Sequence, residues 1–266
     1  MRIPCYQVDA FTKRRFAGNP AAVCPLVRWL PDATLQAIAA ENNLAETAFF
    51  VADGDGFHLR WFTPTVEVDL CGHATLAAAF VLMTEIDRSR TVVRFGSQGG
   101  PLAVTRAGDA YTLDFPARAP VVEEGPPALA AALGCRPEAV LRSRDWLVVL
   151  ESAEAVRAVR PDFAALARVD GVFATIVTGP GDEPGVDFVS RFFAPAQGID
   201  EDPVTGSAHC TLTPYWAGRL GKQELAARQV SRRGGEIRCR LRDGRVDLTG
   251  HAVMVRTGEF LLDDPG

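Results

Sequence analysis

Residues 72–83 read GHATLAAAFVLM, and our prediction of the fold starts from this stretch. From residue 74 onward it is apolar on every side, without the polar stripe of a helix that lies on a surface. A helix of this kind has to be buried all round, so we expect it at the centre of a domain with a sheet wrapped about it. Candidate hairpin strands such as Phe57–Thr63 and Tyr111–Phe115 indicate that the sheet is mainly antiparallel.

The pattern around this helix occurs a second time in the chain. Gly72-His73-Ala74 is echoed by Gly206-Ser207-Ala208, and RWFTP at residues 60–64 is echoed by RFFAP at residues 191–195. Each pair is separated by about half of the chain, which indicates two copies of one module rather than a solenoid. We therefore predict an α+β fold of two pseudo-symmetric domains, each a mostly antiparallel sheet around a buried central helix. The expected domains are residues 1–117 and 118–266, and we leave open whether the last strand returns to the first domain.

The composition, with 47% hydrophobic and 23% charged residues, is that of a folded globular protein. A net charge of −5 without a basic stripe argues against nucleic acid as a partner. The longest strongly apolar stretch, residues 76–83, is far shorter than the ~18–20 residues of a membrane span. Residues 1–6 lack the features of a secretory signal. We therefore expect a cytoplasmic protein with neither a membrane nor a nucleic acid as partner.

The cysteine, histidine and lysine patterns argue against metal and pyridoxal chemistry. The six cysteines contain no C-x-x-C pair, which is typical of reduced thiols, and the four histidines show no H-x-x-x-H spacing. The two lysines, Lys13 and Lys222, lie in polar surroundings, whereas a lysine that forms a Schiff base is normally desolvated. We expect no metal site.

Glu46 is the first candidate for acid/base chemistry. Residues 44–51 read LAETAFFV, which predicts a strand, and a period of two places Glu46 on one face with Leu44, Ala48 and Phe50. Apolar neighbours disfavour the ionised carboxylate, and a carboxyl group in that condition can both accept and donate a proton. The alternative is a glutamate at a strand edge that reaches water.

The two glycine-containing helix starts are candidate binding sites for a carboxylate or an enolate-like oxygen. At Gly72 and at Gly206, free backbone N–H groups and the positive end of the helix dipole converge. Glycine also lets a ligand approach the backbone closely. The alternative is a pair of tight turns in which Ser207 caps its helix.

His73, Asp202 and Asn19 are the remaining polar candidates. His73 precedes an apolar helix and is either a satisfied core histidine or a group that holds a carboxylate or relays a proton. Asp202 lies in Asp200-Glu201-Asp202-Pro203, which is equally consistent with an exposed turn. Asn19 follows Gly18 in a turn-forming stretch, and its amide could also contact a substrate.

Four motifs, in order and spacing, resemble the PhzF family of phenazine-biosynthesis-like isomerases. They are FAGNP at 16–20, NLAET at 43–47, CGHAT at 71–75 and DEDPVTGSA at 200–208. The resemblance implies a diaminopimelate-epimerase-like fold with the active site between two domains, no cofactor, and often a homodimer. It implies that Glu46 moves a proton between carbons, while His73 and Asp202 polarise the substrate. It also implies that the substrate is bound by residues of the remaining motif positions: Gly18, Asn19, Gly72, Gly206 and Ser207.

One departure from the family pattern concerns the substrate. The family often has a serine directly before the glutamate, and this chain has Ala45 there, so one hydroxyl contact is lost. We expect a small carboxylic acid with an activated C–H bond, such as an amino acid, rather than a particular pathway intermediate.

Two other functions stay open. A racemase or epimerase of the same fold uses one cysteine at each helix start, but here Cys71 is matched by Thr205, while Cys210 lies inside the second helix. A protein that keeps the fold to bind a small acid or another protein, without catalysis, is the alternative from a different class. Hydrogen exchange at carbon in heavy water distinguishes an isomerase from such a binding protein.

Overall fold

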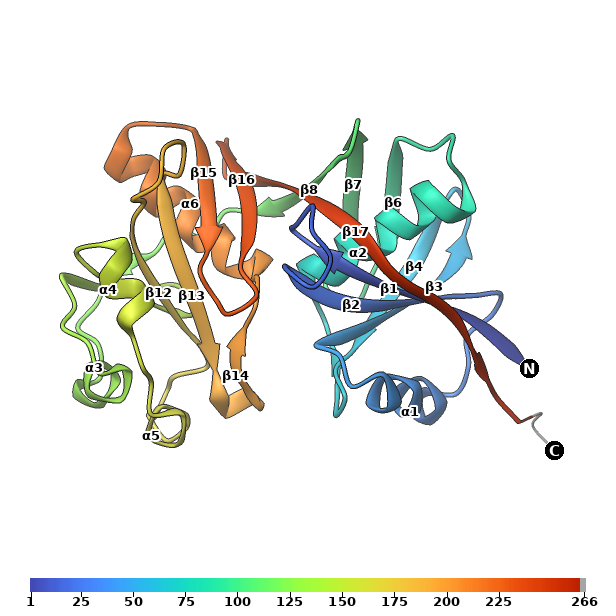
Figure 1. Ribbon diagram of the computed structural model, residues 1–266, viewed down its shortest axis with the longest axis horizontal. Coiled ribbons are helices and arrows are strands. Elements are labelled where there is room, and N and C mark those ends of the chain that lie inside the picture. Colours follow the sequence, from blue (N-terminus) through green and yellow to red (C-terminus); the bar gives the residue numbers. More distant parts are fainter. Residues whose placement is uncertain (264–266) are drawn as a thin grey trace. The chain divides into compact units, whose positions relative to one another are not determined.

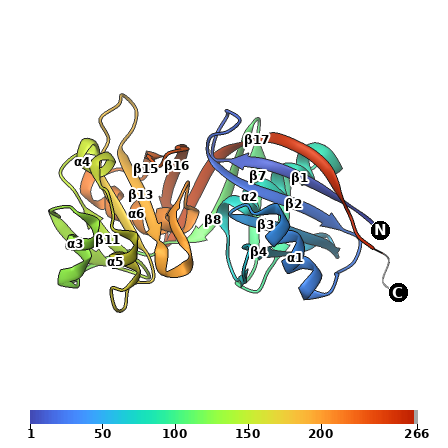
Figure 2. The same cartoon turned by 60° about the horizontal axis from the view of Figure 1, so that its bottom comes forward.

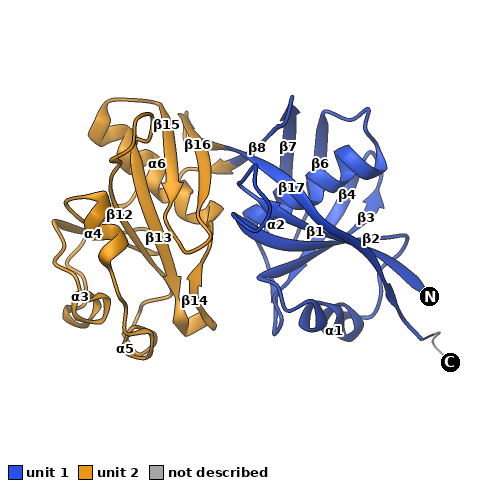
Figure 3. Cartoon of the chain, viewed as in Figure 1, with its two compact units in different colours: residues 1–114, 249–266 blue, residues 115–248 orange. Residues whose placement is uncertain are grey.

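The computed structural model describes residues 1–263, and the chain divides into two compact units. Unit 1 comprises residues 1–114 together with the described residues from Thr249 onward, and unit 2 comprises residues 115–248 (Figure 3). The last strand of the chain, β17 (Arg245–Leu261), contributes residues to both units. Within residues 1–263, no helix is both long enough and apolar enough to cross a membrane.

Unit 1 is built from strands that flank a buried helix. Its elements before β17 are β1 (Arg2–Ala10), β2 (Asn19–Leu26), α1 (Asp32–Asn42), β3 (Glu46–Asp53), β4 (Gly56–Phe62), β5 (Glu67–Val68), α2 (Gly72–Val81), a π-helical turn (Leu82–Ile86), β6 (Val92–Gly96), β7 (Leu102–Ala107) and β8 (Ala110–Pro116). Strand β1 pairs antiparallel with both β2 and β17, as Figure 1 shows. The pairs β2–β3 and β4–β6 are parallel, and the other pairings in this unit for which a register is given are antiparallel.

Helix α2 forms where the apolar sequence predicts a buried helix. Eight of its 10 residues are buried, and it packs against β1, β2, β3 and β7 (Figure 2). The helix begins at Gly72, with the backbone of Cys71 at the N-cap position in an extended conformation. The alanine-rich face lets the strands approach closely, and burial of its larger apolar side chains contributes about 1.5–3 kcal/mol each.

Unit 2 combines a sheet with four helices. Its elements before β17 are β9 (Val121–Val122), α3 (Pro127–Leu133), β10 (Ala139–Arg142), β11 (Trp146–Val149), α4 (Ala153–Ala158), α5 (Phe163–Ala167), β12 (Thr175–Pro180), β13 (Phe188–Ala194), a 3-10 turn (Pro195–Gln197), β14 (Ile199–Asp202), α6 (Gly206–Leu220), β15 (Glu224–Gln229) and β16 (Gly235–Arg242). The pairs β11–β12 and β13–β15 are parallel. Helices α3, α4 and α5 bury apolar side chains in one cluster with β11, β12 and β13.

Helix α6 is continuous although it contains a proline. Pro214 has no N–H group to donate to the carbonyl of Cys210, four residues earlier. The backbone N–H of Arg118 donates to that carbonyl instead, at 2.9 Å. The segment that follows β8 therefore satisfies the carbonyl group that proline leaves free, and the helix start at Gly206 is held on a continuous helix.

The two helix starts that match in the sequence also match in their local structure. Cys71 and Thr205 are both N-cap residues with extended backbone, and Gly72 and Gly206 are both the first helical residues. This agreement supports the matching of the two segments. The pseudo-symmetry of whole domains remains a prediction.

Candidate active site

Glu46 and His73 form a buried pair in unit 1. Glu46 is the first residue of β3, and His73 is the second residue of α2. Glu46 Oε2 lies 3.1 Å from His73 Nε2, and the two side chains are only 12% and 5% exposed. Neither atom has a hydrogen-bond partner within residues 1–263, so this contact is an ion pair whose angle does not meet hydrogen-bond geometry. The pair places an acid/base group and an imidazole together, largely shielded from water.

The other ring nitrogen of His73 faces Asn19 and Cys71. Asn19 Nδ2 lies 3.1 Å from His73 Nδ1, and Cys71 Sγ lies 3.5 Å from the same nitrogen. An amide nitrogen can only donate, so with this orientation of Asn19 the Nδ1 atom accepts and the neutral ring carries its proton on Nε2, facing Glu46. Protonating Nδ1 as well requires the amide of Asn19 to turn its oxygen toward the ring.

Gly18 is required for the turn that brings Asn19 to this position. Its φ of +66° lies in the left-handed region, and a Cβ atom there would lie 2.2 Å from the carbonyl oxygen of Ala10. The backbone conformation disfavours other residues, and the close approach to Ala10 leaves no room for a Cβ without a shift of the backbone. Asn19 is fully buried at the start of β2, and the sequence motif around Gly18 and Asn19 therefore serves to orient His73.

Opposing influences act on the protonation of the buried pair. Burial lowers the pKa of His73, but the neighbouring Cys71 sulfur and the carboxylate of Glu46 outweigh it, so the pKa of His73 lies well above its ordinary value. Burial raises the pKa of Cys71 to about 11, so its thiol stays protonated near neutral pH. The raised pKa of His73 favours a charged imidazole, a state in which the amide oxygen of Asn19 faces Nδ1, and Cys71 is not a thiolate base.

The same cluster contains ligand atoms of the kinds that bind metal ions. Glu46, Cys71 and His73 form a group within residues 1–263 whose carboxylate, thiol and imidazole atoms lie within 4.8 Å of one another. However, the thiol faces Nδ1 of His73 and the carboxylate faces Nε2. The two groups thus approach the imidazole at different ring nitrogens, whereas one metal ion binds only one nitrogen of an imidazole. The arrangement suits proton transfer better than metal ligation.

Unit 2 has a second polar group at the start of α6. The Thr205 hydroxyl donates to Asp202 Oδ2, and Gln229 fixes the backbone between these two residues. Gln229 Oε1 accepts from the N–H of Thr205 at 2.8 Å, and its Nε2 donates to the carbonyl of Asp202 at 2.7 Å. Gly206 is buried and Ser207 is half-buried directly after them. Sequence reasoning missed Gln229, which is marked only by its place in the buried alternation of β15.

His209 lies one turn further along α6. Its Nδ1 atom lies 2.7 Å from the carbonyl oxygen of Thr205, and its ring lies 6.0 Å from that of Phe188. Burial lowers the pKa of His209 to about 4, against the opposing effect of the hydrogen bond to Thr205. The ring is therefore neutral near pH 7 and donates from Nδ1.

The sequence-predicted residues thus gather into two groups, one in each unit. Glu46, His73, Asn19 and Gly72 lie together in unit 1, where Cys71 joins them. Asp202, Gly206 and Ser207 lie at the start of α6 in unit 2.

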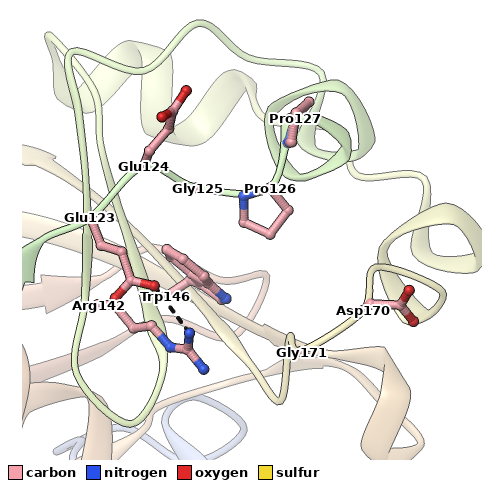
Figure 4. A pocket seen from close by; sticks show the side chains of 9 residues that line it. All are labelled: Glu123, Glu124, Gly125, Pro126, Pro127, Arg142, Trp146, Asp170 and Gly171. Atoms are coloured by element: carbon pink, nitrogen blue, oxygen red, sulfur yellow. Dashed lines mark hydrogen bonds and ion pairs between the residues drawn. The ribbon is translucent and has the colours of Figure 1, made fainter.

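A cavity of about 370 Å³ in unit 2 contains none of these residues. Figure 4 shows it bounded by the segment before α3, by Trp146 and by the loop at Asp170 and Gly171. The guanidinium of Arg142 lies 4.8 Å from the centre of the Trp146 ring and 3.1 Å from Glu123 Oε1. A smaller cavity of about 250 Å³ is lined by Glu201, Pro203, Ser231, Arg232 and Arg233, next to the Asp202 loop. Only this second cavity adjoins a predicted site residue.

The fold of the chain is similar to that of known epimerases. The class is that of α+β proteins with an epimerase-type fold, because a hydroxyproline epimerase from Agrobacterium vitis aligns over 99% of this chain and 94% of its own with a TM-score of 0.60. Its sequence identity is 13%, so this likeness shows the fold alone.

The chain belongs to the phenazine biosynthesis-like protein family, PhzC-PhzF, whose sequence profile matches residues 8–258. An uncharacterised isomerase of Pseudomonas aeruginosa is 55% identical over 98% of this chain and 100% of its own length. A PhzF family protein of Enterococcus faecalis, of known crystal structure, has a TM-score of 0.95 at 49% identity, over 98% of this chain and 100% of its own. The resemblance seen in the four motifs is confirmed, and these relatives support an isomerase-like function in general terms.

Proposed function

We propose that the protein is a cofactor-independent isomerase that moves a proton between carbons of a small carboxylic acid, with Glu46 as the general acid/base. The buried contact of 3.1 Å between Glu46 Oε2 and His73 Nε2 carries this proposal. A carboxylate in a largely dry site, beside an imidazole that can hold positive charge, can take a proton from carbon and return it elsewhere. The relatives named as isomerases agree with this chemistry.

In the proposed reaction Glu46 removes a proton from an activated C–H bond of the substrate, and negative charge develops on the substrate's carbonyl or carboxylate oxygen. The N–H groups at the start of α2, beginning with Gly72, would stabilise such an oxygen, as the first N–H groups of a helix can. His73, when protonated at both ring nitrogens with the amide oxygen of Asn19 turned toward Nδ1, balances the charge of Glu46. Glu46 then donates the proton to a different carbon.

The remaining site residues have supporting roles in this proposal. Asn19, placed by Gly18, fixes the orientation of the His73 ring. Asp202, Gly206 and Ser207 bind polar groups of the substrate, a role supported by the family resemblance and by the start of helix α6 at Gly206. Ala45 offers no hydroxyl group, which favours a substrate with one polar contact fewer at that position.

The thiol-pair epimerase is the weaker alternative. That mechanism needs a thiolate, and burial raises the pKa of Cys71 to about 11. The matching N-cap position of α6 is Thr205, which has no thiol. A protein that binds small acids without turnover would keep the same polar groups, so the deciding experiment has to detect proton transfer itself.

The experiment is hydrogen exchange at carbon. A panel of amino and hydroxy acids is incubated with the protein in heavy water, and mass spectrometry records deuterium at carbon. We expect exchange into at least one acid and a loss of about 10²–10⁴-fold in Glu46→Gln, since general acid/base groups contribute about that much. The control Glu41→Gln, which alters an exposed glutamate in α1, should exchange like the parent. Exchange that persists in Glu46→Gln would refute the proposal, and binding without exchange would favour the non-catalytic function.

A further inference from the structure

Two of the six cysteines, Cys5 and Cys24, lie close enough in unit 1 for each to shift the pKa of the other. In the antiparallel pair β1–β2, Tyr6 is paired with Val23, so one further step along the register places Cys5 opposite Cys24. Opposed residues of antiparallel strands have Cα atoms about 4.5–5.5 Å apart. A disulfide spans Cα separations of about 4.4–6.8 Å, so this position can be bridged without moving the strands.

Both thiols project from the same face of the two strands. Ile3 and Cys5 in β1, and Ala22 and Cys24 in β2, belong to one buried cluster that also includes apolar residues of α1. Alternate residues of a strand share a face, so both cysteine side chains point toward that helix. Cys5 is 7% exposed and Cys24 is fully buried. The two thiols thus already face each other in the folded protein, and Cys5 is the more accessible of the two.

The two thiols differ in reactivity. A hydrogen bond from Cys24 lowers the pKa of Cys5, aided by the charge of Arg256 and by Asn42, and together these outweigh the effect of burial. The same bond, together with burial, raises the pKa of Cys24 well above its ordinary value. The thiolate is the nucleophile and Cys5 is also the more exposed of the two thiols, so Cys5 attacks first and Cys24 is the resolving partner.

We propose that Cys5 and Cys24 are an oxidation site at which a peroxide converts the two opposed thiols into a disulfide between β1 and β2. With hydrogen peroxide, the Cys5 thiolate attacks one oxygen, so that an S–O bond forms, the O–O bond breaks and hydroxide leaves. Cys24 loses its proton and attacks the sulfur of the Cys5 sulfenic acid, forming the S–S bond as the S–O bond breaks. The thiols lose two electrons and two protons, and the peroxide becomes two water molecules.

The disulfide would link the two ends of residues 5–24, a segment that contributes to the candidate active site. The chain between the two cysteines contains Gly18 and Asn19, and Asn19 contacts His73. Oxidation would therefore add a covalent link between the two strands that hold Gly18 and Asn19 in place. This site is independent of the proposed isomerase activity, because the product is detected chemically on the protein itself.

The test maps thiols after treatment of the reduced, full-length protein with hydrogen peroxide. The protein is then denatured, alkylated with N-ethylmaleimide, digested and examined by mass spectrometry. We expect a peptide pair linked through Cys5 and Cys24 to form about tenfold faster than any modification of Cys135. Cys135 is the decisive comparison because it is the least buried of the six thiols, yet burial raises its pKa and it has no opposed cysteine.

Two variants complete the design. Cys24→Ser removes the resolving thiol, so Cys5 should be trapped as a sulfenic acid by dimedone, with no linked peptide. Cys135→Ser should form the Cys5–Cys24 link at the parent rate. Oxidation of Cys135 while Cys5 and Cys24 remain thiols would overturn the proposal, as would a link from Cys5 to any other cysteine. Because the first measurement uses the parent protein, poor folding of Cys24→Ser would not obscure the result.

Discussion

Acidification should destabilise the protein through His209, by an amount that follows from the burial of its ring. The side chain is fully buried, and burial lowers its pKa to about 4 from an ordinary value of 6.5. The unfolded chain therefore takes up a proton before the folded chain does. The contribution of the neutral ring to stability is complete above about pH 6.5 and is lost as the pH falls toward 4.

The magnitude follows from linkage between protonation and folding. A difference of one pKa unit corresponds to about 1.4 kcal/mol, so the whole shift of His209 amounts to about 3 kcal/mol. Between about pH 7.5 and about pH 5, only part of this is lost, and the free energy of unfolding should fall by about 2 kcal/mol from this residue.

The assay is urea unfolding of the parent and of His209→Asn at these two pH values. Asparagine keeps an N–H group that can donate to the carbonyl of Thr205, which His209 contacts at 2.7 Å, but it does not titrate. His73 titrates in both proteins, so its effect cancels in the comparison. We expect the parent to lose about 2 kcal/mol more than the variant on acidification. Equal losses, to within about 0.5 kcal/mol, would show that the buried ring does not control acid stability.

Three further substitutions test the site geometry. Gly18→Ala should lower the free energy of unfolding by about 1–3 kcal/mol in thermal melts, because the backbone is left-handed and a Cβ would meet the carbonyl of Ala10; an unchanged melting temperature would contradict this. Gln229→Leu should lower the free energy of unfolding by about 2–4 kcal/mol and reduce deuterium exchange at the substrate carbon, because it leaves buried backbone groups unpaired. A variant as stable as the parent would show that Gln229 does not support the start of α6. Asn19→Asp should raise the pKa of His73, measured by NMR titration, because a carboxylate opposite Nδ1 favours the charged ring; a lowered or unchanged pKa would mean that this contact is absent in solution.

Local hydrophobic patterns in the sequence were sufficient to predict the helix and the strand that position the site. The apolar run after His73 predicted a buried helix, and α2 is one. The strand predicted over residues 44–51 is β3, which begins two residues later at Glu46, and Glu46 lies beside His73.

Contacts between distant segments could not be predicted in the same way. Gln229 supports Asp202 through hydrogen bonds that span 27 residues of sequence, and no local pattern encodes such a pairing. The opposition of Cys5 and Cys24 depends on the register between β1 and β2, which follows from the turn that joins them. The Asn19 contact to His73 requires the backbone conformation of Gly18, and the motif alone indicated only a turn.

The pairing of β1 with β17 sets the order in which the chain can fold as it is synthesised. Arg2 is paired with Leu261, and the register continues to Ala10 opposite Ala252. Unit 2 is one continuous segment, so all of its residues are synthesised before the partner of β1. At about 5–20 residues per second, one edge of β1 waits roughly 10–50 s for that partner. Until then this edge of β1 carries unpaired backbone groups, with which the strand of another chain can pair.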